Sequence, residues 1–239
     1  MIIDAHVHLG GAPARQGSPQ EILQQLDEIG AGAAVTMPGP GLRPDNAGLR
    51  PLLEAGGGRF HGCAWVNPAL GHEAAAELES CGQWGWKFVK LQPEMHNFSM
   101  LDQATEEVAE VAGALGMTVI VHTGGSVKAQ PWAVGEIASR HRGTRFILDH
   151  MGGPEAEDVR VAILMAERHP NIWLGTSKSI DRHKYRQAVD VIGAERLVFG
   201  SDAPNVSMAS EIVRVQHAGF SEAELELILG RNALHLLQA

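Results

Sequence analysis

The sequence predicts an α/β protein that folds as one domain, a single (β/α)8 barrel of the TIM type spanning residues 1–239. Short apolar runs rich in β-branched residues alternate with longer segments of helical periodicity, which is the pattern of repeated β-α units around a parallel sheet. Eight such runs occur in one uninterrupted series, and this number favours a closed barrel over an open doubly wound sheet. The short spacing between the runs predicts a compact barrel in which most loops are short.

Each predicted strand is a short run of mostly apolar residues. In chain order the strands are Ile2 to His8, Ala33 to Met37, Phe60 to Val66, Trp86 to Leu91, Thr118 to His122, Arg145 to His150, Ile172 to Thr176 and Leu197 to Ser201.

The segments between these strands carry the apolar spacing of helices and, in several cases, a helix-start signal. Ser18 precedes a proline and lies three residues before Glu21, and Ser221 begins a Ser-Glu-Ala-Glu capping box. The predicted helices are Pro19 to Ile29, Asn46 to Ala55, Gly71 to Ser80, Leu101 to Leu115, Pro131 to Arg140, Ala156 to Arg168, Lys184 to Val191 and Met208 to Ala218, followed by a final helix or helix pair over Ser221 to Leu237.

The longest segments without a predicted element all follow the carboxyl end of a strand. They are Gly10 to Ser18, Pro38 to Asp45, Gln92 to Ser99 and Met151 to Glu155. Barrels of this kind build their active sites on that face, so we expect the functional residues there.

Composition excludes several classes of partner. The net charge is −9, from 28 acidic and 19 basic residues, so the chain has no basic surplus for nucleic acid or an anionic membrane. The N-terminal segment lacks the basic and apolar regions of a signal peptide, and no run reaches the roughly 18 apolar residues of a membrane span. We therefore expect a cytoplasmic protein that acts on a small-molecule substrate. The sequence leaves open whether the chain forms a homo-oligomer.

The first candidate site is a pair of histidines near the start of the chain. His6 and His8 lie two residues apart on the first predicted strand, so their imidazoles point to the same face of the sheet. Neutral imidazole nitrogens suit a divalent transition metal. A chance pair at a polar strand end explains these two residues equally well when they are taken alone.

Three other predicted strands also end on a side chain that can bind a metal. His122 and His150 end the fifth and sixth strands, and Asp202 directly follows the eighth. In a closed barrel the eighth strand pairs with the first, which brings Asp202 beside His6 and His8, while His122 faces them from the opposite wall. Three nitrogens and one oxygen with room for water form the open arrangement of a catalytic zinc site.

Several motifs, in this order along the chain, resemble the amidohydrolase superfamily, and most closely its second-type, decarboxylase-like branch. They are Asp4-Ala-His6-Val-His8, Lys90-Leu-Gln-Pro93, Val121-His122-Thr-Gly124, Asp149-His150-Met-Gly-Gly153, Pro170-Asn-Ile-Trp-Leu174, the segment Ile192 to Pro204 and the segment Leu229 to Leu237. The resemblance covers essentially the whole chain. One departure is Gly175, where the branch often has an aspartate or a similar polar residue, so the resemblance does not define the contribution of the seventh strand.

The resemblance implies one divalent metal ion, most simply zinc with manganese as an alternative, held by His6, His8, His122 and Asp202. It also implies that His150 contacts the activated water or the substrate, and that Asp202 or His150 takes the proton of that water.

Lys90 introduces a second metal model. In binuclear relatives a lysine on this strand is carboxylated and bridges two metals, with His150 as a further ligand. The same motif occurs in mononuclear relatives, and we favour one metal, with Lys90 unmodified and either salt-bridged or contacting the substrate. Arg43, His96 and Trp132, on segments that follow the second, fourth and fifth strands, are further candidates for substrate binding.

Four hypotheses for function follow from these residues. The leading one is hydrolysis of an amide, lactone or ester of a small molecule by metal-activated water. Non-oxidative decarboxylation of a small aromatic or unsaturated acid is the alternative, because the resembled branch contains both reactions on the same ligands. A metal-free enzyme on this scaffold, and a module that holds metal without catalysis, are the remaining two.

Overall fold

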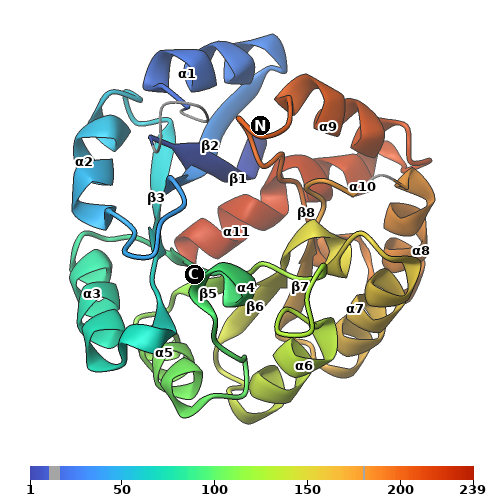
Figure 1. Ribbon diagram of the computed structural model, residues 1–239. Helices are drawn as coiled ribbons and strands as arrows, with labels where there is room; N and C mark the ends of the chain where they lie inside the picture. The colour runs from blue at the N-terminus through green and yellow to red at the C-terminus, as the bar shows by residue number, and fades with distance from the viewer. Residues whose placement is uncertain (11–16, 180) are drawn as a thin grey trace.

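The computed structural model describes residues 1–10, 17–179 and 181–239, which form a (β/α)8 barrel and so confirm the predicted fold (Figure 1). All seven neighbouring strand pairs are parallel, in the order β1 to β8. The strands are β1 Ile2–Leu9, β2 Ala31–Pro38, β3 Phe60–Trp65, β4 Phe88–Leu91, β5 Thr118–Val121, β6 Arg145–Leu148, β7 Ile172–Gly175 and β8 Leu197–Val198.

Backbone hydrogen bonds between β1 and the segment after β8 complete the ring. The amide of Ala5 donates to the carbonyl of Phe199 over 2.9 Å, and the amide of Asp202 donates to the carbonyl of His6 over 2.8 Å. Further along β1, the amide of His8 donates to the carbonyl of Ala203 over 2.7 Å. This pairing confirms the expectation that the eighth strand delivers Asp202 beside the two histidines.

Most helices surround the barrel, as the alternating pattern predicts, and others lie at its ends. The helices are α1 Pro19–Glu28, α2 Asn46–Glu54, α3 His72–Gln83, α4 Pro93–His96, α5 Gln103–Ala114, α6 Pro131–Arg140, α7 Ala156–Arg168, α8 Arg182–Ile192, α9 Met208–Gln216, α10 Glu222–Glu226 and α11 Asn232–Gln238. Both predicted capping boxes are present, at Ser18 and Ser221. The C-terminal segment is a helix pair, α10 and α11, joined by a short π-helix over Leu227–Arg231.

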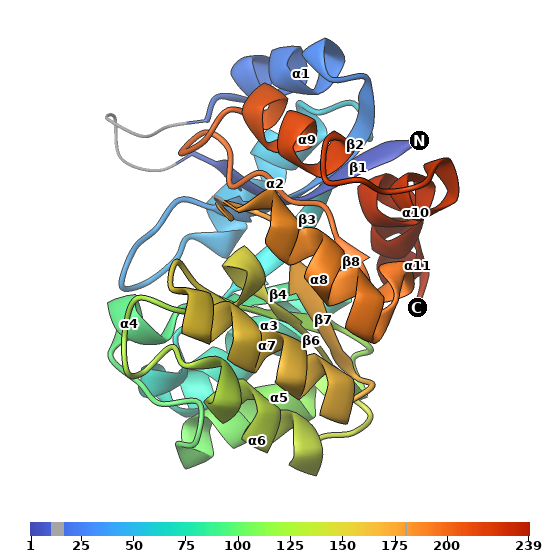
Figure 2. The ribbon, with the colours of Figure 1, turned by 90° about the vertical axis from the view of Figure 1, so that its right-hand side faces the viewer.

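Apolar side chains pack in two layers. The larger layer lies between the strands and the surrounding helices, and the smaller one fills the barrel interior. Ala233 and Leu236 of α11 belong to the interior layer, so this helix closes one end of the barrel. Figure 2 shows α4 at the opposite end, where the carboxyl ends of the strands open.

The structure corrects some predicted boundaries. Strand β8 ends at Val198 instead of Ser201, and β6 ends at Leu148 instead of His150, because the chain leaves the sheet in both places. Part of the loop predicted over Gln92 to Ser99 is the short helix α4. Residues 11–16 of the predicted loop Gly10 to Ser18 lie outside the described part of the chain.

No helix in residues 1–10, 17–179 and 181–239 has the length and apolar character needed to cross a membrane.

Candidate active site and metal centre

A cavity of about 150 Å³ opens at the carboxyl ends of the strands. Each of the eight strands, or the segment after it, contributes to the described lining, which consists of His6, His8, Pro40, Trp65, Lys90, Gln92, Met95, His122, His150, Lys178, Asp202 and Asn205. Five of the residues selected from the sequence as metal-binding or catalytic, His6, His8, His122, His150 and Asp202, therefore line one cavity.

A larger cavity of about 460 Å³ lies at the other end of the barrel, against α11. Two tryptophans, Trp84 and Trp86, line it together with apolar residues, and its described titratable side chains are His61 and Lys87. Two isolated titratable groups do not form a constellation for catalysis, so the smaller cavity is the candidate active site.

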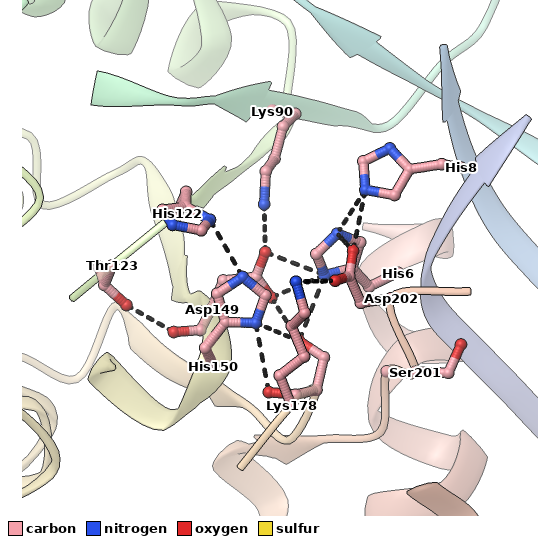
Figure 3. Close-up of polar contacts among 12 residues, drawn as sticks. His6, His8, Lys90, His122, Thr123, Asp149, His150, Lys178, Ser201 and Asp202 are labelled. Atoms are coloured by element: carbon pink, nitrogen blue, oxygen red, sulfur yellow. Dashed lines mark hydrogen bonds and ion pairs between the residues drawn. The ribbon is translucent and has the colours of Figure 1, made fainter. Parts of the chain in front are cut away.

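His6, His8 and Asp202 form a compact triangle of donor atoms (Figure 3). The Nε2 atoms of His6 and His8 are 3.2 Å apart, and Asp202 Oδ1 lies 3.3 Å from the first and 3.0 Å from the second. Strand alternation puts the two histidines on one face of β1, and the turn after β8 directs Asp202 toward them.

The other nitrogen of each imidazole has an acceptor. His6 Nδ1 lies 3.0 Å from the Asp149 carboxylate, and His8 Nδ1 lies 3.4 Å from the carbonyl of Pro38. These acceptors favour the proton on Nδ1, which leaves two Nε2 lone pairs facing each other and the carboxylate. Such an arrangement is repulsive unless a cation or a proton lies between the donors.

This geometry fits a divalent metal ion. In a tetrahedral shell with bonds near 2.0–2.1 Å, donor atoms are about 3.3–3.4 Å apart, close to the three distances of the triangle. All three residues are buried. Burial lowers the pKa of His8, which favours the neutral imidazole that a metal needs. Although burial opposes ionisation of Asp202, the neighbouring His6 and His8 hold its pKa below the ordinary carboxylate value.

His122 and His150 form a second pair on the opposite wall of the cavity. His122 Nδ1 lies 3.0 Å from His150 Nε2, and the two rings meet edge to face. Burial lowers the pKa of His122 to about 2 and that of His150 to about 4, so both are neutral at physiological pH. His150, with His6 and Asp149, belongs to a second buried group of potential metal donors, whereas the structure places His122 beside His150 and outside the triangle.

Asp149 and Lys90 form a buried ion pair beside His6. Each residue is 1% exposed, and the Lys90 ammonium contacts Asp149 Oδ2. Although burial opposes ionisation of Asp149, its interactions with His6 and Lys90 keep its pKa well below the ordinary value. Asp149 thus joins Lys90 to the histidine that carries one corner of the triangle.

In the sequence, Asp149 stands out only as part of the Asp149-His150-Met-Gly-Gly153 motif, and it was not selected as a site residue. The strand ends before both residues, and His150 has a left-handed backbone with φ of 56°, so His150 lines the cavity while Asp149 contacts His6 behind it. The sequence signal for a role of Asp149 is its position next to His150 at the end of a predicted strand.

The segment after β7 contributes Ser177 and Lys178, which the sequence analysis also missed. Ser177 Oγ lies 2.9 Å from His150 Nδ1 and 3.2 Å from Asp149 Oδ1. The Lys178 ammonium lies 2.6 Å from Asp202 Oδ2. Strand β7 ends at Gly175, which has no side chain, so the contribution of this part of the barrel comes from the contacts of Ser177 and Lys178.

Of the three candidates for substrate binding on the loops, none is among the described lining residues of the cavity. Arg43 is mostly exposed and pairs with Glu73 over 2.8 Å. His96 is buried, and its Nε2 donates to the carbonyl of Gly41 over 2.9 Å. Trp132 lies on α6 with 46% of its surface exposed.

A family model described as amidohydrolase, of the second type, matches residues 3–238. The chain belongs to this amidohydrolase family. Among curated proteins, none matches the sequence of this amidohydrolase.

Solved structures share the fold of this amidohydrolase at low sequence identity. A probable 2-pyrone-4,6-dicarboxylic acid hydrolase from Acinetobacter baumannii, with citric acid bound, has a TM-score of 0.78 and 18% identity and covers 100% of this chain and 99% of its own. A 5-carboxyvanillate decarboxylase from Sphingomonas paucimobilis has a TM-score of 0.79 and 16% identity over 99% and 98% of the two chains. An uncharacterized TIM-barrel protein from Bordetella bronchiseptica has a TM-score of 0.83 and 18% identity over the same shares.

Proposed function

We propose that this amidohydrolase hydrolyses an amide, lactone or ester of a small molecule with the help of one divalent metal ion, zinc or manganese. The observation that carries the proposal is the buried triangle of His6 Nε2, His8 Nε2 and Asp202 Oδ1 at the edge of a cavity. A buried donor set of this kind, open on one side, is suited to catalysis.

His6, His8 and Asp202 would hold the ion, with His122 as the fourth candidate ligand. When bound, a divalent ion supplies a Lewis acid that polarises a carbonyl and lowers the pKa of water. The Asp149 carboxylate would keep His6 in the tautomer that offers Nε2, because it accepts the proton on Nδ1.

His150 is the proposed general base. Its side chain lines the cavity, and Ser177 fixes the ring through Nδ1. His150 would accept the proton of the attacking water at Nε2 and return it to the leaving nitrogen or oxygen. The proposed role of Lys90 is to keep Asp149 ionised as an unmodified amine, in support of His6.

Decarboxylation of a small aromatic or unsaturated acid is the second candidate. It is favoured by Lys178 in the lining of the cavity, because an ammonium group binds a carboxylate. One of the structures that share the fold is described as a decarboxylase, in keeping with this alternative.

Metal analysis tests the site. We expect close to one zinc or manganese ion per chain, removal of activity by a chelator, and loss of the metal from His6→Ala and Asp202→Asn. His150→Asn should keep the metal and lose most of the rate. Full metal and activity in the first two variants would refute the site, and loss of half the metal from His150→Asn would support a binuclear centre with carboxylated Lys90.

Product analysis tests the reaction. Metal-loaded enzyme is incubated with matched panels of lactones, aryl esters and amides, and with a panel of hydroxylated aromatic acids. The proposal expects ring opening or ester cleavage that stops in His150→Asn. Release of CO2 from the acids without turnover in the other panels would establish the decarboxylase instead.

A further inference from the structure

Lys178 is the more accessible of the two lysines that line the described part of the cavity. Its side chain is 43% exposed, whereas that of Lys90 is 2% exposed and paired with Asp149. The Lys178 ammonium contacts Asp202 Oδ2, while Oδ1 of the same carboxylate faces His6 and His8. The two carboxylate oxygens therefore face different partners, and the ammonium lies at the edge of the donor triangle.

The backbone of Lys178 is held in an unfavourable conformation. Its φ is 57°, in the left-handed region that costs a residue with a side chain roughly 1 kcal/mol or more. Such a conformation persists only where surrounding contacts fix it. Here it turns the lysine toward the cavity instead of along the surface.

Glu211 of α9 is the contact that fixes it. Its carboxylate Oε2 accepts the backbone N–H of Lys178 over 3.0 Å, and Oε1 pairs with Arg214. Glu211 is 1% exposed, although it belongs to a helix on the outside of the barrel. The hydroxyl of Tyr185 donates to the carbonyls of Thr176 and Ser179 on either side of this turn.

We propose that Lys178 determines specificity by binding an anionic group of the substrate, and that Glu211 is the residue that positions it. The inference rests on the proposed function for its location in the site. The Lys178 side chain is 43% exposed, and a bound metal ion would still compensate the Asp202 carboxylate, so Lys178 can exchange Asp202 for a substrate anion without leaving a buried charge unpaired. The buried Lys90 cannot make that exchange without leaving Asp149 uncompensated.

A matched pair of esters tests Lys178 in the metal-loaded enzyme. Phenyl acetate and 4-acetoxybenzoate present the same ester, and only the second carries a carboxylate. Lys178→Met should lower the kcat/KM ratio of the anionic to the neutral ester by about tenfold to hundredfold, mainly through KM, as expected for one charge-assisted hydrogen bond. Lys178→Arg should restore most of the ratio, and an unchanged ratio in Lys178→Met would overturn the proposal.

Lys128→Met is the control, because it removes the same charge from a loop at the same end of the barrel. Lys128 contacts Asn97 and is not among the described lining residues, so the ratio should stay within twofold of wild type. An equal fall in both lysine variants would mean that overall charge, and not Lys178, sets the preference.

A binding measurement separates this inference from the proposed reaction. Calorimetric titration of metal-loaded protein with 4-hydroxybenzoate and 4-hydroxybenzamide needs no turnover. Wild type should bind the acid more tightly than the amide, and Lys178→Met should lose that preference even if neither ester is hydrolysed. Equal affinities in wild type, or no binding of the acid, would overturn the role of Lys178.

Glu211 is tested by removing its acceptor oxygens. Glu211→Leu should lower the ester ratio in the same direction as Lys178→Met, whereas Glu211→Gln keeps an oxygen for the Lys178 amide and should retain most of it. A purely structural role predicts a lower Tm for Glu211→Leu with an unchanged ester ratio, and that result would refute the positioning role.

Discussion

The buried pair of Lys90 and Asp149 allows a quantitative prediction about stability. Asp149→Asn keeps the size of the side chain and removes its charge, which leaves the Lys90 ammonium buried without an anion. Breaking a buried pair by removing one partner costs about 3–5 kcal/mol, and at 2% side-chain exposure solvent screening does not reduce it. For a domain of this length the loss corresponds to a fall in Tm of roughly 6–20 °C.

Urea unfolding in the presence of a chelator measures this cost, because bound metal would add its own stabilisation. The double variant Lys90→Met/Asp149→Leu replaces the pair by apolar side chains and should recover much of the loss. Arg43→Ala is the control for an exposed pair, since its partner Glu73 is 66% exposed, and it should change stability by less than about 1 kcal/mol.

Two results would refute this reasoning. One is a loss from Asp149→Asn no larger than that from Arg43→Ala, which would mean that the Lys90 charge is compensated elsewhere. The other is a double variant no more stable than the single one, which would trace the loss to packing. Asp149→Asn should also weaken metal binding by about tenfold to hundredfold, because the carboxylate orients His6.

Three further changes have defined outcomes. Burial raises the pKa of Glu211 from 4.5 to about 7. Between pH 4.5 and pH 7 the folded state therefore binds more protons than the unfolded state. The free energy of unfolding should fall by up to about 3 kcal/mol as the pH rises through this range. Glu211→Gln should flatten this part of a Tm-against-pH profile, and an unchanged slope would assign it to another group. Gly124→Ala should lower the free energy of unfolding in urea far more than Gly125→Ala. Both glycines have a positive φ, but only at Gly124 would a Cβ lie 2.2 Å from the Gly153 backbone. Equal losses in the two variants would contradict this close approach. Tyr185→Phe should cost about 1 kcal/mol in the same assay through its lost hydrogen bonds, and no loss would show that they contribute nothing.

Periodicity predicted the fold and much of the site for a physical reason. Strand side chains alternate faces, so the parity of His6 and His8 on β1 follows directly from their spacing. Ring closure then places the end of β8 beside β1, and the hydrogen bond from Asp202 to His6 confirms it. Neither inference needs knowledge of any loop.

The predictions failed where the chain leaves the sheet. Asp149 and Lys178 follow the last paired residues of β6 and β7, so alternation no longer fixes where they point. Their positions depend on left-handed turns at His150 and Lys178, and a residue with a side chain gives no sequence signal of positive φ as glycine does. Contacts from distant segments, such as Glu211 to Lys178, hold these turns in place.

Strained backbone conformations coincide with the candidate active site in this barrel. Of the five non-glycine residues with positive φ in the described part of the chain, His150, Lys178 and Asp202 line the cavity. The left-handed backbone of each such residue costs roughly 1–3 kcal/mol of folding free energy. An ordinary turn after the strand would avoid this cost. The buried apolar layers of the barrel supply the stability that offsets this cost. Because β6, β7 and β8 end before these residues, the turns, and not the strands, direct the three side chains into the cavity. A sequence that favours the fold at nearly every strand and helix therefore departs from local preference at the residues proposed to bind metal, water and substrate.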